Sequence, residues 1–368
     1  MQDSLESPDA VYATETGTDI HGWIGQVVPD SPSQLGRMEV YRAENFPLVG
    51  PIPWLDRPDA AQAIKRAEKE GRITPDEAAL CRHWRDRGYV ILQGFFSPEE
   101  LDVAWLAYEK SIAEGLVVPQ VDRGQENATD GLPGRVLNPH NKIPEIRDMW
   151  SNPAMASIVS VLLGAEAVPF QTIVGHKGSE QQSHSDSIHM STCPIGYLAA
   201  NWIAFEDIAA DSGPLEFYPG SHKLPYLFCD DVGITFEETT KSGYSPYHEK
   251  YEPAVARLIA ESGLKPEYFL CKKGDVLIWH ANLLHGGARR QNPARTRKAL
   301  VCHYFARGCV CYHDYAGSLS CLHPAKVKLA DFDAEAYLQA NPDVLAAGVD
   351  PWEHYLDFGY QEGRSIAP

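Results

Sequence analysis

The sequence predicts a mainly β fold with flanking helices, completed by a small helical appendage at the C-terminal end. Between residues 166 and 308, short β-branched and aromatic runs are separated by turns, as at 168–174, 197–205, 275–279 and 298–305. Many short strands that do not alternate with helices are typical of a sandwich or barrel and argue against a doubly wound parallel sheet. After about residue 325 the apolar residues return at helical spacing, which predicts two or three short helices.

The first elements follow from local signals. Residues 1–57 contain several prolines and turn formers without periodicity, so we expect an arm that lies over the domain or is partly disordered. The motifs T-P-D-E at 74–77 and S-P-E-E at 97–100 are capping boxes with proline at the first helical position. They predict helices from Thr74 to about Gly88 and from Ser97 through Ser111.

Two further elements complete the helical N-terminal part. The apolar, β-rich run at 88–94 predicts a strand of a buried sheet. A third helix is expected after Ser151-Asn152-Pro153, and it should end at Gly164.

Composition excludes several classes of protein. Of 368 residues, 44% are hydrophobic and 22% charged, as in globular proteins and unlike disordered or collagen-like chains. Lys and Arg number 32 against 50 Asp and Glu, and the resulting net charge of −18 repels polyanions, so no nucleic-acid partner is expected. No apolar run reaches the roughly 18–20 residues of a membrane span, and the first ten residues do not resemble a secretory signal. We therefore expect a cytoplasmic protein without a membrane partner.

The sharpest local signal is the motif Q-Q-S-H-S-D at 181–186. On a strand, residues i and i+2 point to the same face, so His184 and Asp186 would converge on one point. An imidazole and a carboxylate placed in this way need at least one more ligand to hold a metal ion. Gln181, at the start of the motif, is predicted to hydrogen-bond to the substrate or cosubstrate.

A second signal supplies the missing ligand. At 273–287 a turn and an apolar strand lead to His285, which two glycines follow. Two histidines and one carboxylate on one face of a metal, with open positions opposite, are typical of non-haem Fe(II) oxygenases. We therefore predict that His184, Asp186 and His285 form a catalytic metal site. His280, five positions before His285, is not expected to be a ligand.

A basic stretch follows the second histidine. Arg297 opens the strand predicted at 298–305 and can reach back toward the metal. A guanidinium binds a carboxylate through two parallel hydrogen bonds, so Arg297 suits a dicarboxylate cosubstrate. Arg289 and Arg290, closer to His285, are better explained as part of a solvated loop.

The order of these motifs resembles the phytanoyl-CoA dioxygenase family of Fe(II)/2-oxoglutarate-dependent oxygenases. The most specific stretch, SGPLEFYPGSHK at 212–223, is similar to the family's G-P-L…P-G-S-H-K turn. GYV at 88–90 and WIAFED at 202–207 resemble its other landmarks, and the resemblance covers about 80–310.

The resemblance implies a double-stranded β-helix, which is a cupin-like jelly roll, and a reaction that uses Fe(II), 2-oxoglutarate and O2. His184, Asp186 and His285 match the iron ligands of the family, and Arg297 matches the arginine that holds the C5 carboxylate of 2-oxoglutarate. Two departures stand out. Ser183 replaces a frequent aromatic residue, and the gap from His285 to Arg297 is one residue longer than usual, which keeps Arg295 as a rival to Arg297.

Three parts of the chain are therefore expected: an arm at 1–57, an oxygenase domain at 58–325 with a helical N-terminal part, and a small acidic helical module at 326–368. The last part resembles a short module appended to various bacterial proteins. The polar and aromatic insertion at 222–270 is a candidate lid, and substrate specificity is expected to depend on it and on 115–140.

The sequence predicts an Fe(II)- and 2-oxoglutarate-dependent dioxygenase that hydroxylates a small-molecule metabolite and releases succinate and CO2. Two alternatives from other classes remain open. One is a non-redox hydrolase with zinc on the same triad. The other is a binding protein that keeps the β scaffold but has lost turnover. Neither the substrate nor the oligomeric state follows from the sequence.

Overall fold

The computed structural model describes residues 39–40, 49–120, 131–315, 318–322, 327–328 and 333–355. A six-stranded antiparallel sheet forms the centre, in the order β2-β9-β6-β11-β4-β3. Its strands are β2 (Tyr89–Leu92), β9 (Val276–His280), β6 (Leu198–Ala204), β11 (Ala299–Ala306), β4 (Ala167–Gly175) and β3 (Val136–Leu137).

Smaller antiparallel sheets accompany the large one. The first has the order β10-β7-β8 and carries His285 at its edge. Its strands are β10 (His285–Gly287), β7 (Leu215–Phe217) and β8 (Glu267–Tyr268). The second, β13-β12-β5, contains β13 (Ser318–Leu322), β12 (Val310–His313) and β5 (Ser191–Cys193), and β1 (Glu39–Val40) pairs with β14 (Val327–Lys328).

Both faces of the six-stranded sheet are covered. Along β9, Val276 and Ile278 belong to the main core with the helices, whereas Leu277 and Trp279 pack with Leu215 and other residues near the small sheet. Strands that are covered on both sides bury every residue, and the whole of β6 and β9 is buried. This explains why these strands form continuous apolar runs in the sequence.

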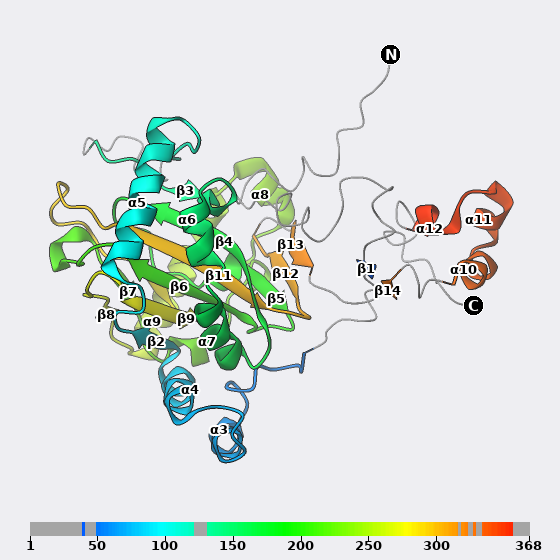
Figure 1. Ribbon diagram of the computed structural model, residues 1–368, viewed down its shortest axis with the longest axis horizontal. Helices are drawn as coiled ribbons and strands as arrows, with labels where there is room; N and C mark the ends of the chain where they lie inside the picture. The colour runs from blue at the N-terminus through cyan, green and yellow to red at the C-terminus, as the bar shows by residue number, and fades with distance from the viewer. Residues whose placement is uncertain are drawn as a thin grey trace.

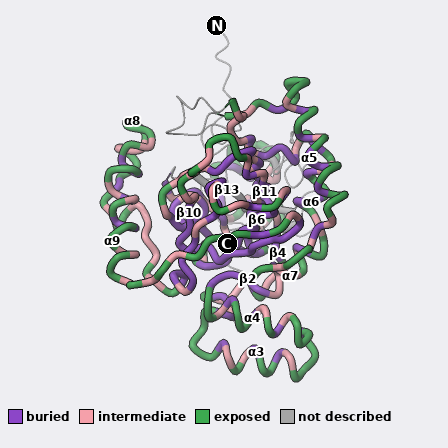
Figure 2. The backbone as a smooth tube through the Cα atoms, turned by 90° about the vertical axis from the view of Figure 1, so that its left-hand side faces the viewer, coloured by how far each residue is buried: buried purple, intermediate pink, exposed green. Residues whose placement is uncertain are grey.

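Helices cover the outer face of the sheet. In Figure 1, α5 (Pro98–Ala113), α6 (Pro144–Trp150) and α7 (Pro153–Leu163) lie along one side of it. Below them lie α3 (Ala60–Lys69) and α4 (Pro75–Arg87). Figure 2 shows the buried strands at the centre, with more exposed helices around them. The predicted mainly β fold with flanking helices is confirmed.

Local signals placed the helix ends accurately. Both capping boxes are formed, because Thr74 accepts from the backbone of Glu77 and Ser97 accepts from that of Glu100. Helix α4 ends at Gly88, which has φ 81°, a left-handed conformation that glycine adopts without strain. The strand predicted at 88–94 is β2, but it lies at the edge of the sheet and leaves Ile91 40% exposed.

The insertion at 222–270 is largely helical. It contains α8 (Phe236–Ser242), a π-helix (Tyr247–Tyr251) and α9 (Glu252–Ser262). Tyr247 and Tyr251 are buried in a satellite core with Ile188 and Tyr315, so the insertion is packed onto the domain.

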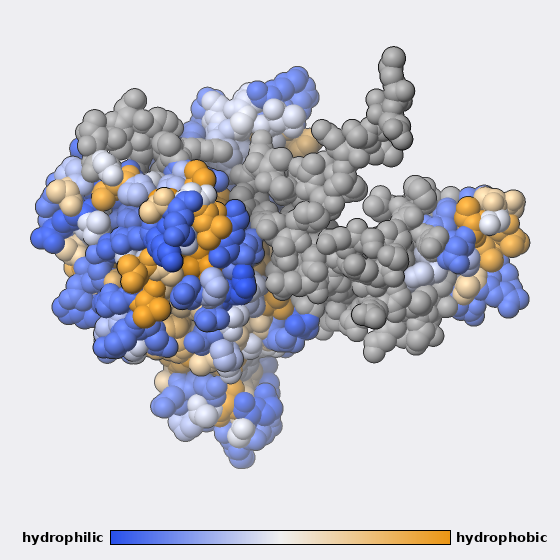
Figure 3. Space-filling view, turned by 45° about the horizontal axis from the view of Figure 1, so that its top comes forward, coloured by the Kyte–Doolittle hydropathy of each residue, from blue (hydrophilic) through white to orange (hydrophobic). Residues whose placement is uncertain are grey.

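The C-terminal region forms three short helices that contact one another, as the helical spacing predicts. They are α10 (Ala334–Ala340), α11 (Pro342–Ala347) and α12 (Pro351–His354), and the two X-Pro pairs separate them. Tyr337 and Val344 are buried, whereas Leu345 and Val349 are exposed. Figure 3 shows apolar surface on this region, at the right of the view. No helix among the described residues combines the length and hydrophobicity that a bilayer span requires.

Most of the predicted arm at 1–57 lies outside the described residues. Its end is ordered against the domain, with Leu55 in the main core and Asp56 beside His280.

Candidate active site

A backbone pair joins the two predicted histidine ligands. The N–H of His184 donates to the carbonyl of His285, and the N–H of His285 donates back to the carbonyl of His184, both at 2.9 Å. This isolated antiparallel bridge brings the two imidazoles to a centroid separation of 4.6 Å. Two segments far apart in the sequence are thereby locked in register at the site.

Each imidazole is oriented by a second backbone contact. Nδ1 of His184 lies 2.8 Å from the carbonyl of Gln182, and Nδ1 of His285 lies 2.9 Å from that of Leu283. A carbonyl can only accept, so Nδ1 carries a proton in both rings and Nε2 is the nitrogen left for a metal. Both Nε2 atoms are thus prepared to bind a metal.

Asp186 completes the group, although not on a strand. It opens a 3-10 turn over Asp186–Ile188, so the expectation that 184–186 is extended was wrong beyond Ser185. The turn still brings its carboxylate to the histidines, and the candidate ligand atoms of the three residues all lie within 4.8 Å of one another. No other group of three such residues occurs in the described ranges.

An indole fixes the carboxylate. Trp279 Nε1 donates to Asp186 Oδ2 at 2.7 Å, and Asp186 Oδ1 lies 3.7 Å from His285 Nε2. One oxygen is therefore held by the sheet while the other faces the imidazoles. Such outer contacts orient metal ligands and tune their affinity.

The electrostatics of the site favour a cation. Burial lowers the pKa of His184 to about 4, so its imidazole is neutral at pH 7. Burial alone would raise the pKa of Asp186, but the facing imidazoles, that of His285 first, outweigh it and hold this pKa below its ordinary value. Two imidazole nitrogens beside a buried carboxylate form the donor set of non-haem iron sites, so these residues fit a ferrous ion.

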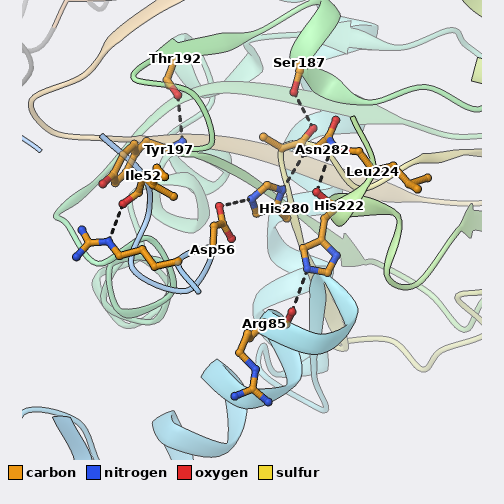
Figure 4. Close-up of polar contacts among 12 residues, drawn as sticks. Ile52, Asp56, Arg85, Ser187, Thr192, Tyr197, His222, Leu224, His280 and Asn282 are labelled. Atoms are coloured by element: carbon orange, nitrogen blue, oxygen red, sulfur yellow. Dashed lines mark hydrogen bonds and ion pairs between the residues drawn. The ribbon is translucent and has the colours of Figure 1, made fainter. Parts of the chain in front are cut away.

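The turn that precedes His285 is held by a polar network outside the site (Figure 4). His280 Nε2 lies 3.1 Å from Asp56 Oδ2, and His280 Nδ1 accepts from the backbone N–H of Asn282. Asn282 in turn donates to the carbonyls of His222 and Leu224. His280 is therefore a structural residue, in agreement with the prediction that it is not a ligand.

The turn at 220–223 supports the same loop. Ser221 Oγ accepts from the backbone N–H of Leu284, and His222 Nε2 lies 3.1 Å from the carbonyl of Arg85. Gly88 provides the space for this ring, since a Cβ there would lie 2.4 Å from His222 Nδ1. The motif S-H-K thus connects α4 to the residue before the second histidine.

The glycines after His285 allow a close approach of two chain segments. A Cβ on Gly286 would lie 2.7 Å from the carbonyl oxygen of Gln181, and one on Gly287 would lie 2.6 Å from Ser179 Oγ. The N–H of Gly287 donates to the same Gln181 carbonyl at 2.9 Å. Larger residues here would separate the segments that carry His184 and His285.

The two candidate arginines occupy different environments. Arg297 is buried, donates from Nη1 to the carbonyl of Gly213 at 3.0 Å and lies over the Trp202 ring at 5.5 Å. Arg295 Nε instead donates to Asp211 at 2.8 Å with a 54% exposed side chain. Arg297 lines a cavity with the triad, whereas Arg295 lies outside it.

Two cavities meet at the triad. The smaller, of about 120 Å³, is lined by all three triad residues and by Arg297. The larger, of about 360 Å³, is lined by His184 and Asp186 and by residues of the insertion at 222–270. Both cavities therefore reach the same candidate metal position.

Gln181, the predicted contact residue, lines both cavities. Two further histidines line one cavity each, His176 the smaller and His189 the larger. His189 stacks on Tyr247 of the insertion with a centroid separation of 5.1 Å.

Sequence reasoning missed three residues around the metal position: Gln171, Trp279 as the partner of Asp186, and His303. For His303 a signal existed. Alternation along the strand that starts at Arg297 places residues 299, 301 and 303 on the same face, and all three line the smaller cavity.

Comparison with known proteins identifies relatives. A sequence profile described as "Phytanoyl-CoA dioxygenase (PhyH)" matches residues 84–299. The phytanoyl-CoA dioxygenase domain-containing protein 1 of Danio rerio is 23% identical over 259 residues, which cover 57% of this chain and 84% of that protein. The Mus musculus protein of the same name is 32% identical over 93 residues, covering 24% of this chain and 31% of its own.

Solved structures share the fold. The apo form of EctD from S. alaskensis superposes with a TM-score of 0.51 and 20% identity, covering 70% of this chain and 86% of its own. SnoK, described as a non-heme alpha ketoglutarate dependent carbocyclase from nogalamycin biosynthesis, gives a TM-score of 0.50 and 17% identity, covering 67% and 88%. The double-stranded β-helix fold is thereby confirmed.

Proposed function

The chain belongs to the phytanoyl-CoA dioxygenase family of Fe(II)- and 2-oxoglutarate-dependent oxygenases, and from this premise we propose that it hydroxylates a small molecule at His184, Asp186 and His285. The observation that carries the proposal is the convergence of these three donors beside Arg297. When bound, iron and 2-oxoglutarate supply the oxidising chemistry: 2-oxoglutarate and O2 give succinate and CO2, and the second oxygen atom enters the substrate.

The three ligands have distinct roles in this proposal. His184 and His285 each present Nε2 to the metal position, because their Nδ1 atoms are directed at backbone carbonyls. Asp186 contributes the negative charge and is held by Trp279. Since all three donors approach from one side, the opposite side is left for 2-oxoglutarate, O2 and substrate.

Arg297 is proposed to bind the far carboxylate of 2-oxoglutarate. It is buried at the end of the smaller cavity, and the bond to Gly213 and the ring of Trp202 fix its position. A guanidinium in a water-poor site pairs strongly with a carboxylate through parallel hydrogen bonds. Gln181, at the junction of the cavities, is proposed to hydrogen-bond to the cosubstrate or substrate.

The alternatives have less support. A zinc hydrolase on the same triad would need a water beside the metal but has no use for a buried arginine directed at a dicarboxylate. A binding protein without turnover has no need of three oriented ligands. We therefore retain the oxygenase and treat residues 58–325 as its catalytic unit.

The test is anaerobic loading of the protein with Fe(II) and 2-oxoglutarate, followed by a pulse of oxygen. Succinate should form only when iron, 2-oxoglutarate and O2 are all present, and zinc should not replace iron. His184→Ala and His285→Ala should abolish succinate formation, while His83→Ala on the exposed side of α4 should not. Succinate formation that survives either triad variant would remove that histidine from the ligand set.

A further inference from the structure

Two polar side chains from neighbouring strands line the larger cavity. Gln171 of β4 and His303 of β11 are direct partners in the antiparallel pairing of these strands. Directly opposed residues on neighbouring strands point to the same face, and both residues line the cavity. They are 5% and 2% exposed, so both are buried within the barrel.

Each of the two side chains has one buried polar atom without a hydrogen bond from the protein. Within the described residues, neither Gln171 Oε1 nor His303 Nδ1 has a partner. Buried polar groups in folded proteins nearly always have one, and exceptions call for an explanation such as an absent water or ligand. The cavity beside these two atoms has room for a water molecule or a ligand that would be their hydrogen-bond partner.

The position of these atoms connects them to the reaction site. His303 Nε2 lies 3.9 Å from Asp186 Oδ2, so the ring is next to the proposed iron position. Gln171 lines only the larger cavity, whereas Arg297 lines only the smaller one. His303 lines both cavities, so Gln171 faces the compartment that 2-oxoglutarate does not occupy and His303 lies where that compartment meets the smaller one.

Most of the other residues that line the larger cavity carry polar groups, and Leu137, Ile173 and Met190 are the aliphatic ones. Its walls include Gln120, Arg135 and Glu252, and Tyr244 and Tyr247 cover it from the insertion. An alkyl chain that reached the iron would displace water from Gln171 and His303, and it has no group that could form hydrogen bonds with them. Such burial without compensation is unfavourable.

We infer that the larger cavity binds a polar small molecule whose hydrogen-bonding groups pair with Gln171 and His303 beside the carbon that is oxidised, and that it rejects a fatty acyl chain there. This inference rests on the proposed function, because that function assigns the smaller cavity to 2-oxoglutarate. Gln171 and His303 are then specificity-determining residues.

The inference predicts that an apolar replacement opens the cavity to alkyl chains. Gln171→Met keeps a similar length but removes the amide. Binding of decanoate to the iron-free protein, measured by titration calorimetry, should be at least tenfold tighter in Q171M than in the wild type. Both proteins keep the same charged residues, so a difference in affinity for decanoate reflects the contact between its alkyl chain and residue 171. Gln62→Met, on the exposed side of α3, is the matched control and should bind as the wild type does.

A second measurement separates a ligand-binding role from a structural one. Because Gln171 Oε1 has no partner among the described residues, Q171M should unfold at the same temperature as the wild type or higher. Gln171→Leu provides a second variant if Q171M does not fold. Three outcomes would overturn the inference. Decanoate could bind the wild type and the folded variant equally, bind neither of them, or bind the wild type more tightly. None of these outcomes depends on turnover, so they are distinct from a failure of the proposed function, which would appear as absent succinate.

Discussion

His184 and His285 exchange two backbone hydrogen bonds of 2.9 Å, and each ring is turned by a carbonyl two residues before it. The same bridge therefore sets both the distance between the imidazoles and the direction of their free nitrogens. Gly286 and Gly287 allow it, because a side chain at either position would meet the segment at 179–182. The geometry of the metal site is thus a property of the strand pairing rather than of flexible side chains.

Loss of the guanidinium of Arg297 should weaken 2-oxoglutarate binding. Hydrogen bonds to charged groups contribute about 1.5–3 kcal/mol, so Arg297→Ala should raise the KM for 2-oxoglutarate by about 10- to 100-fold. Arg295→Ala is the matched control, since its side chain pairs with Asp211 at the surface, and it should change KM less than about twofold. Succinate formation at varied 2-oxoglutarate concentration measures both, and the reverse order of effects would assign the role to Arg295.

Removal of the indole N–H that hydrogen-bonds to Asp186 should lower the affinity for the metal. Trp279→Phe keeps an aromatic ring in the core but deletes the 2.7 Å bond to Oδ2. Loss of an outer contact to a ligand usually lowers metal affinity by about 10- to 100-fold. Competition for Fe(II) with a chelator of known affinity checks this, and Trp54→Phe, whose indole donates to Val161 away from the site, is the control. Unchanged affinity in Trp279→Phe would show that the bond does not matter for the metal.

The metal-free protein should lose stability in mild acid. Burial lowers the pKa of His313 to about 4 and that of His222 to about 3. An unfolded histidine takes up its proton near pH 6.5, whereas these folded ones do so only near pH 4 or below. The free energy of unfolding should therefore reach its maximum contribution from these histidines above pH 6.5. It should fall as the pH drops toward 4, by up to about 1.4 kcal/mol per pH unit for each histidine.

Urea unfolding at pH 7.5 and pH 5 measures this dependence. His313→Gln should make the pH dependence shallower than in the wild type, whereas Gln62→Met, at an exposed position of α3 that carries no titratable group, should leave it unchanged. Equal pH dependence in the wild type and His313→Gln would show that His313 is not buried in its neutral form.

The C-terminal module is expected to be dispensable for turnover. Among the described residues, those that line the two cavities at the triad all come from outside 326–368. A chain truncated after residue 325 should form succinate at a rate within about twofold of the full chain. A large loss of rate with an unchanged unfolding temperature would instead assign the module a part in the reaction.

Local signals in the sequence were sufficient for part of the fold. Capping boxes and left-handed glycines act within a few residues, so α4, α5 and α7 could be predicted almost to their ends. The convergence of His184, Asp186 and His285 was also predictable, since their residue types and order indicate a metal site.

The remaining details depend on contacts between distant segments. Asp186 opens a 3-10 turn whose carboxylate is held by Trp279, 93 positions away, and no local pattern encodes that bond. Likewise, the two arginines lie two positions apart in the sequence and differ only in their tertiary contacts: Arg295 pairs with Asp211 at the surface, whereas Arg297 is buried in the cavity. Gln171 and His303 face each other only through the register of β4 and β11.

The most direct test is a crystal structure of the protein loaded anaerobically with Fe(II), with diffraction data collected at the iron absorption edge. We predict one anomalous peak within coordination distance of Nε2 of His184, Nε2 of His285 and a carboxylate oxygen of Asp186. Iron bound elsewhere, or a peak that one of these three side chains does not reach, would contradict the account.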